Sequence, residues 1–147
     1  MQIIGFNFTK VLAERILEIY KPNISTNIEF TNIDKESINL LKDIESAGVS
    51  FKYALSYENT KDEESQKKKI DSKSGELIFE GKIIISIDQE ESKNLYKAWK
   101  KKELPNSFKV PLFNLILKKC TPRALNYQEE LGLPNHIPMP RLERKDQ

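Results

Sequence analysis

The chain has 147 residues, of which 38% are hydrophobic and 31% charged, enough for one domain with a modest core and a well-solvated surface. Its net charge of +2 does not mark a nucleic-acid-binding protein, and 20 lysines against 4 arginines argue weakly against specific DNA readout. One cysteine, Cys120, excludes an intramolecular disulfide and a cysteine-based zinc site. Neither a signal peptide nor a run of ~20 apolar residues is evident, so we expect a cytoplasmic protein without a membrane span.

The first two segments with strand character lie near the start of the chain. IIGFNF places Ile4, Phe6 and Phe8 on one face, and NIEFTNI does the same with Ile28 and Phe30. Both segments therefore predict strands with one apolar face.

Two later segments alternate more clearly. In residues 49–57 every second residue is apolar or aromatic, which is typical of a strand with one buried face. Residues 76–88 repeat the pattern, although Ile78 and Ile84 lie among the polar residues of the second face. That face is therefore partly apolar. Gly81 indicates a bulge or a close approach of another backbone.

The segments between these strands are less regular. Residues 58–75 are polar and predict a flexible hairpin loop, with contact to a polyanion as the less favoured alternative. Residues 34–48 are ambiguous. Their apolar residues fit one face of a helix that stops at Gly48, and they equally fit a continuation of the preceding strand.

The C-terminal third predicts helices. Residues 89–103 have acidic residues first and lysines last, as the helix dipole favours, and Leu95, Tyr96 and Trp99 line one side. Residues 110–132 predict a longer helix.

In the longer segment, Pro111 suits a first helical position and Gly132 the residue after a helix end. Its apolar stripe comprises Phe113, Ile116, Leu117, Cys120, Ala124, Tyr127 and Leu131. At Pro122 either the helix kinks or Thr121 caps a second helix, and the continuous stripe favours a kink or a tight junction. Residues 133–147 form a proline-rich extended tail.

The order of elements predicts an α+β fold. Four strands precede the helices without β–α–β alternation, so we expect a four-stranded antiparallel sheet with the C-terminal helices packed on one face. Residues 1–147 are expected to form a single domain.

The motifs of enzymes are missing from the sequence. It contains no glycine-rich phosphate loop, and its acidic residues are scattered through polar runs. Cys120 lies on the apolar stripe, which favours a buried, inert thiol over a dyad with His136. The lone His136 is better interpreted as a packing or capping residue. We therefore expect neither an enzyme nor a bound metal or cofactor.

A lysine cluster surrounds the only tryptophan. Lys97, Lys100, Lys101 and Lys102 flank Trp99, and a basic helix with one aromatic residue can contact RNA phosphates. The favoured interpretation places Trp99 in the core and the lysines in water.

The layout resembles the SecB family of export chaperones. Members have four antiparallel strands, a short helical segment, a long helix and a proline-punctuated tail. The segments that carry the resemblance are IIGFNFTK, TNIEFTNI, VSFKYALSY, GELIFEGKIIISID, PNSFKVPLFNLILKKC and LPNHIPMPRL. The family's first helical segment, rich in small residues, is here the lysine-rich SKNLYKAWKKKE. Its acidic tail is replaced by RLERKDQ, which argues against a role specific to translocation.

The resemblance implies a holdase, a homo-oligomer (dimer or tetramer) that binds non-native polypeptides through apolar grooves. The partly apolar second face of the last strand and the apolar residues of the tail supply the candidate client-binding residues, Ile78, Ile84, Ile137, Met139 and Leu142.

The alternative is a ribosome-associated protein that binds ribosomal RNA or ribosomal proteins. Basic clusters motivate it, and its candidate residues are Lys97, Trp99, Lys100, Lys101, Lys102, Lys67, Lys68, Lys69, Arg141 and Arg144.

Overall fold

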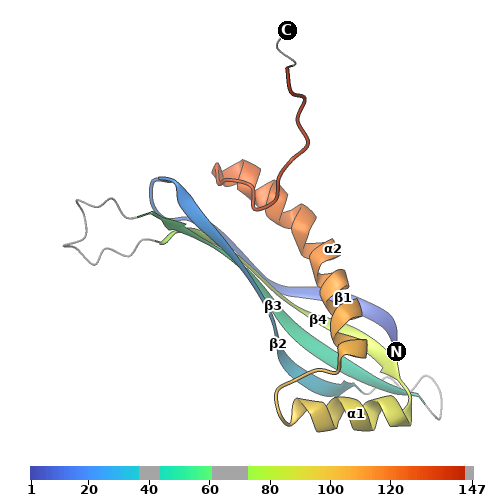
Figure 1. Ribbon diagram of the computed structural model, residues 1–147. Coiled ribbons are helices and arrows are strands. Elements are labelled where there is room, and N and C mark those ends of the chain that lie inside the picture. Colours follow the sequence, from blue (N-terminus) through green and yellow to red (C-terminus); the bar gives the residue numbers. More distant parts are fainter. Residues whose placement is uncertain (37–43, 61–72, 145–147) are drawn as a thin grey trace.

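The computed structural model, which describes residues 1–36, 44–60 and 73–144, shows the predicted α+β fold (Figure 1). Four long strands precede two helices and an extended tail. The strands are β1 (Gln2–Arg15), β2 (Pro22–Glu36), β3 (Glu45–Asn59) and β4 (Lys73–Ile87), and the helices are α1 (Gln89–Trp99) and α2 (Asn106–Leu131). No helix within these ranges is long and apolar enough to cross a membrane.

The strands form one antiparallel sheet in the order β1-β4-β3-β2. Since β1 and β2 are consecutive in the chain but lie at opposite edges, the segment between them crosses the ends of β3 and β4. The side chain of Asn59 holds this crossover by accepting from Tyr20 N at 2.8 Å and donating to Glu18 O at 2.7 Å.

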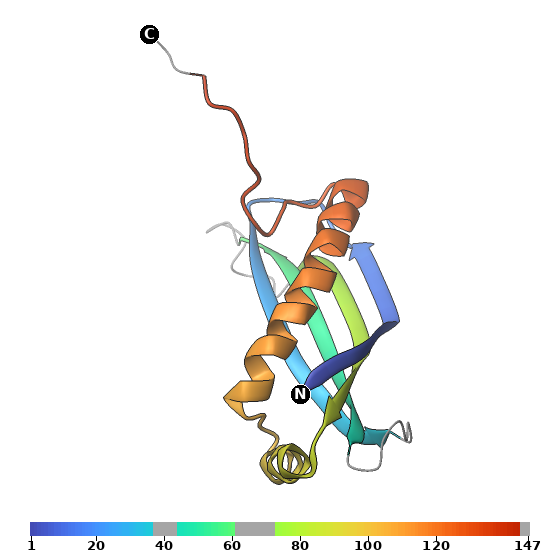
Figure 2. The ribbon, with the colours of Figure 1, turned by 90° about the vertical axis from the view of Figure 1, so that its right-hand side faces the viewer.

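The core lies between one face of the sheet and α2, which crosses that face (Figures 1 and 2). Alternate residues of β3 and β4 point inward and are buried, as the period-two pattern predicts. Every fourth residue of α2 meets them, because side chains four apart share one helix face. The buried row of α2 is Phe108, Leu112, Ile116, Cys120, Ala124 and Gln128.

The opposite face of the sheet is largely polar. Ile78 and Ile84 are half-buried there. Lys82 is ion-paired with Glu36, and its Nζ lies 3.7 Å from Asp34 Oδ2. This face therefore combines charge pairs with a few apolar side chains.

Helix α2 begins earlier than predicted and is continuous. Phe108 N donates to Pro105 O at 2.9 Å, so the helix starts after Pro105, and Pro111 lies inside it rather than at its first position. Pro122 also lies inside, and no second helix begins at Thr121. Both prolines are exposed, so the carbonyls that they leave unpaired face the solvent side.

The predicted stripe of α2 is partly wrong. Leu117 is 42% exposed, whereas Gln128, which the apolar pattern passed over, is fully buried. The buried row follows strict spacing of four, and Leu117 lies one residue off it.

The two uncertain connections are shorter than predicted within the described residues. Strand β2 continues to Glu36 and β3 begins at Glu45, so Gly48 lies in a strand and does not end a helix. Strands β3 and β4 reach into the 58–75 segment from both ends, and residues 61–72 lie outside the described part.

The close backbone approach predicted at Gly81 is confirmed, whereas the bulge lies opposite it, on the neighbouring strand. A Cβ there would lie 2.5 Å from Asn7 O and 2.8 Å from the Phe51 ring. The register of β1 against β4 shifts between Phe8 and Lys10, opposite Gly81, so the bulge lies in β1.

Candidate functional site

A groove of about 580 Å³ runs beside the edge strand β2, where this strand meets the connection between α1 and α2. Its lining residues are Ile28, Glu29, Phe30, Trp99, Lys102, Glu103, Leu104, Asn106, Lys109 and Phe113. Two segments that are distant in the sequence, residues 28–30 of β2 and residues 99–113, therefore form one surface.

Aromatic rings give the groove its apolar character. Phe30 is on the core-facing side of β2, and Phe113 follows the buried row of α2 by one residue, so each ring lies at the margin of the core. Their centroids are 4.9 Å apart at 47°. Both rings and Trp99 are only half-buried, which leaves aromatic surface available to a ligand.

The turn that ends α1 positions Lys102 in the groove. Lys102 N donates to Trp99 O at 2.8 Å, and Glu103 N donates to Ala98 O at 3.2 Å, the two bonds of a Schellman motif. Lys102 is at the left-handed position with φ 59°, where glycine is the relaxed residue. A non-glycine residue there costs about 1–2 kcal/mol.

Two of the aromatic rings in the groove, those of Trp99 and Phe113, each have a lysine ammonium group beside them. Lys102 Nζ lies 4.9 Å from the centroid of Trp99, and Lys109 Nζ lies 5.7 Å from that of Phe113. Glu29 and Glu103 line the same groove. The site thus combines apolar surface with charges of both signs, a composition suited to binding a chain segment rather than to acid–base chemistry.

The other end of α2 is closed by a buried polar network. Gln128 Nε2 donates to Tyr57 Oη at 2.6 Å and lies 3.0 Å from His136 Nδ1. Tyr57 Oη donates to Pro134 O at 2.8 Å, and His136 Nε2 lies 3.3 Å from Tyr53 Oη. These bonds fix the start of the tail against β3.

Burial shifts the pKa values of Tyr53, Tyr57 and His136 in the directions that favour their neutral forms. Burial raises the pKa of Tyr53 to about 12, raises that of Tyr57 and lowers that of His136. A neutral His136 satisfies both neighbours when Gln128 donates to Nδ1 and Nε2–H donates to Tyr53. No buried side-chain polar atom in the described ranges lacks a partner.

Cys120 and His136 do not form a dyad. The two imidazole nitrogens of His136 face Gln128 and Tyr53. Cys120 is fully buried, and burial raises the pKa of its thiol to about 12. The thiol is therefore protonated and unreactive near neutral pH, as predicted.

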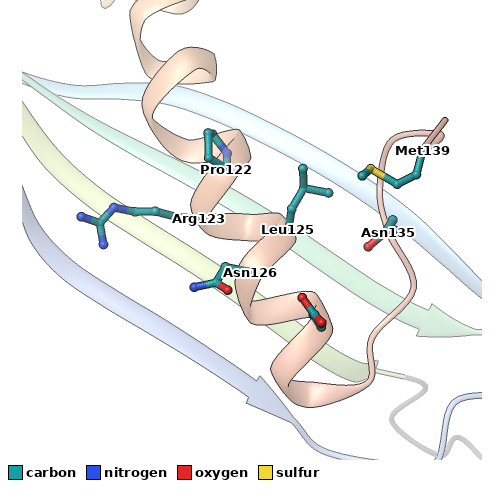
Figure 3. Close-up of a pocket in the computed structure, with 7 residues that line it drawn as sticks. Pro122, Arg123, Leu125, Asn126, Asn135 and Met139 are labelled. Carbon is teal, nitrogen blue, oxygen red and sulfur yellow. The ribbon is translucent and has the colours of Figure 1, made fainter.

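A second hollow, of about 800 Å³, lies between α2 and the tail (Figure 3). It is lined by Pro122, Arg123, Leu125, Asn126, Glu129, Asn135 and Met139. Arg123 points away from the tail, and its guanidinium lies 4.6 Å from the centroid of Phe8 on β1 (Figure 3). Across the described residues no group of three or more metal-binding side chains occurs, in this hollow or elsewhere.

The structure does not bring the five candidate client-binding residues together. Ile78 and Ile84 lie on the outer face of the sheet, whereas Ile137, Met139 and Leu142 are exposed in the tail, whose start packs on the inner face.

The candidate RNA-binding residues are also dispersed. Lys97, Lys100, Lys101 and Lys102 are exposed around the half-buried Trp99, while Arg141 and Arg144 lie in the tail. Lys67, Lys68 and Lys69 lie outside the described residues.

Sequence reasoning missed the groove as a site. Ile28, Phe30 and Phe113 carry a core signal in the sequence, and their positions at the margin of the core follow only from the packing. The available signal was Trp99 among lysines, since Trp99 and Lys102 both line the groove.

Comparisons with known proteins agree on the fold alone. No protein-family profile matches the sequence, and no curated protein shows significant similarity to it. A solved structure of the Mycobacterium tuberculosis Rv1957 SecB-like chaperone, in complex with a ChAD peptide from the Rv1956 HigA1 antitoxin, is similar over 99% of this chain and 92% of that one, with a TM-score of 0.53 and 12% sequence identity. The chain therefore shares its fold with a SecB-like chaperone.

Proposed function

We propose that this protein is a holdase chaperone that binds extended, non-native polypeptide segments in the groove beside β2. The observation that carries the proposal is the set of half-buried rings of Phe30, Trp99 and Phe113 that line a groove along an edge strand. Half-exposed aromatic surface favours ligand burial, and an edge strand offers backbone donors and acceptors to an extended chain. The shared fold with a chaperone that was solved with a peptide supports the same function.

Trp99 provides a direct assay, because it is the only tryptophan in the chain. A tryptophan-free peptide with an aromatic centre should change the emission of Trp99 as it fills the groove. The protein should also suppress aggregation of a chemically denatured client at stoichiometric ratios. A client that aggregates at the same rate with and without the protein would contradict the proposal.

Variants separate the groove from the rest of the surface. Phe30→Ala with Phe113→Ala should weaken peptide binding at least about tenfold, since each ring loses apolar contact area. Ile16→Ala, an exposed apolar position in the crossover between β1 and β2, should leave binding unchanged. Met139→Ala tests the tail residues separately, and an equal loss of binding there would assign client contact to the tail.

We further propose that the chain forms a homo-oligomer through β1. Ile3, Ile4 and Val11 of this edge strand are exposed, and unpaired strand edges readily pair with another chain. Sedimentation equilibrium should show a dimer or tetramer, and Ile4→Lys with Val11→Lys should reduce it to a monomer. A wild-type protein that sediments as a monomer would contradict this proposal.

Ribosome association is the alternative function, and the exposed lysines around Trp99 favour it. It predicts that the protein sediments with a ribosomal subunit in a lysate and is released as salt is raised. Neutralising Lys100, Lys101 and Lys102 should abolish that comigration, and an unchanged profile would remove the cluster from consideration.

A further inference from the structure

Charge is distributed unevenly between the helical part of the chain and the rest. Residues 89–131, the two helices and their connection, contain nine lysines and arginines and five glutamates, a net charge of +4, whereas the whole chain carries +2. All nine cationic side chains are exposed. The ion pairs of the described residues involve Met1, Arg15, Lys73, Lys82 and Arg141 instead. The cations of the helical part are therefore available to a ligand.

From this charge and the geometry of the groove we infer that the groove selects extended segments in which an aromatic or large aliphatic residue is flanked by aspartate or glutamate. The inference rests on the proposed function, because it names the class of segment that the same groove takes. Lys102 and Lys109 lie 4.9 Å and 5.7 Å from the centroids of Trp99 and Phe113. An apolar side chain that binds against either ring lies near the ammonium group beside that ring. Acidic residues next to it in an extended segment, about 3.3 Å further along the chain, can pair with these ammonium groups.

The backbone conformation of Lys102 supports this role. The turn is held by backbone hydrogen bonds from Lys102 and Glu103, which any residue except proline can make. The left-handed φ of 59° favours glycine, so the lysine side chain is kept at a position where it adds strain. What the side chain adds is an ammonium group at the groove, consistent with strain being retained at functional sites.

Two glutamates in the groove lining restrict the positions at which a bound segment can carry acidic residues. Glu29 on β2 and Glu103 in the connection repel carboxylates close to them. Acidic positions of the ligand are therefore favoured on the side of Lys102 and Lys109. Replacing Glu103 by glutamine should accordingly strengthen binding of an acidic segment.

A polypeptide fits these features better than RNA. Ile28, Phe30 and Leu104 provide an apolar lining. Among the described residues β2 is an edge strand, whose backbone groups can pair with a polypeptide but not with nucleic acid. Eight of the nine cations in the helical part are lysines, and Arg123 is the exception. Lysine does not offer the bidentate geometry of arginine toward phosphate. RNA binding is therefore an outcome for the experiment to exclude.

The test uses three tryptophan-free peptides of equal length with the same aromatic centre, flanked by glutamate, glutamine or lysine, and Trp99 emission as the readout. The glutamate peptide should bind about fivefold more tightly than the glutamine peptide, and the lysine peptide should bind most weakly. The preference should shrink in 0.5 M salt, because the Debye length falls from about 10 Å at 0.1 M to roughly 4 Å. Equal affinities would overturn the inference and leave the proposed function standing, whereas no binding of any peptide would overturn both.

Charge variants locate the preference. Lys102→Gln with Lys109→Gln should bring the glutamate peptide to the affinity of the glutamine peptide, which itself should stay unchanged. Lys118→Gln removes one charge of the same helix outside the groove and should keep the preference. If this control abolishes the preference equally, or if a single-stranded RNA of equal charge displaces the glutamate peptide at lower concentration, the groove is not selective for acidic segments.

Discussion

The two ends of α2 pack on the same face of the sheet, but one end is covered by the tail and the other is left partly exposed. At the C-terminal end, Gln128, His136 and Tyr57 satisfy one another and bind the start of the tail. At the N-terminal end, the rings of Phe30 and Phe113 pack together but remain half-exposed in the groove. The difference lies in what the chain itself supplies. The tail returns over one end and completes it, whereas the other end is left as surface that a ligand can cover.

The largest expected effects come from two neighbouring residues of α2. Ile116→Ala removes a fully buried side chain and should lower the free energy of unfolding by about 2–5 kcal/mol, with peptide affinity unchanged in the folded fraction. Phe113→Ala removes a half-buried ring, so it should cost only about 1–2 kcal/mol but weaken peptide binding. Urea unfolding and Trp99 titrations measure both. If Ile116→Ala weakened binding as much as Phe113→Ala, the two regions would not be separable.

The closed end should respond to the loss of a single hydroxyl group. Tyr57→Phe removes one of the two hydrogen bonds of Gln128 Nε2 and the bond to the Pro134 carbonyl, which should cost about 1–3 kcal/mol. Tyr127→Phe is the matched control, because Tyr127 is half-buried and contacts Phe79 through its ring; its cost should stay within about 0.5 kcal/mol. Hydrogen exchange of the backbone amides of Leu133, Asn135, His136 and Ile137 should accelerate in Tyr57→Phe alone. Equal protection in the two variants would show that the network does not hold the tail.

The pH dependence of stability should report the same network. Burial lowers the pKa of His136 from its usual 6.5, so below that pH the unfolded chain binds a proton that the folded chain does not. Stability is therefore full above pH 6.5 and falls as the pH drops through 6.5 toward the lower folded-state pKa. In His136→Asn the free energy of unfolding should no longer fall between pH 7.5 and 5.5, because the chain has no other histidine. A variant that keeps the slope would place the titration elsewhere.

The same comparison shows what the sequence could predict. Strand periodicity located β3 and β4, and the buried Cys120 followed from its place among apolar residues. The closed end was not predicted, because glutamine is a polar residue that the apolar pattern does not place in a core. Gln128 can be buried because Tyr57 and His136 form hydrogen bonds with its side-chain amide. The groove was missed for the converse reason. Phe113 is a large apolar residue of the kind found in cores. It is half-exposed because it lies one residue after Leu112 of the buried row on α2.

The smallest expected effect concerns the turn at the open end. Lys102→Gly relieves a left-handed backbone but removes an ammonium group 4.9 Å from the Trp99 ring. Strain relief exceeds the loss of an exposed cation–π contact, so the free energy of unfolding should rise by about 0.5 kcal/mol.

Lys100→Gly is the matched control, because Lys100 has helical φ and ψ of −57° and −28°, where glycine should instead cost about 0.5–1 kcal/mol. Thermal unfolding distinguishes the two signs. Since Lys102→Gly should bind the acidic peptide less tightly while being the more stable protein, stability and binding would move in opposite directions at one residue. If Lys102→Gly lowered the free energy of unfolding instead, the Lys102 side chain would be stabilising the fold, and its charge in the groove would not indicate a ligand.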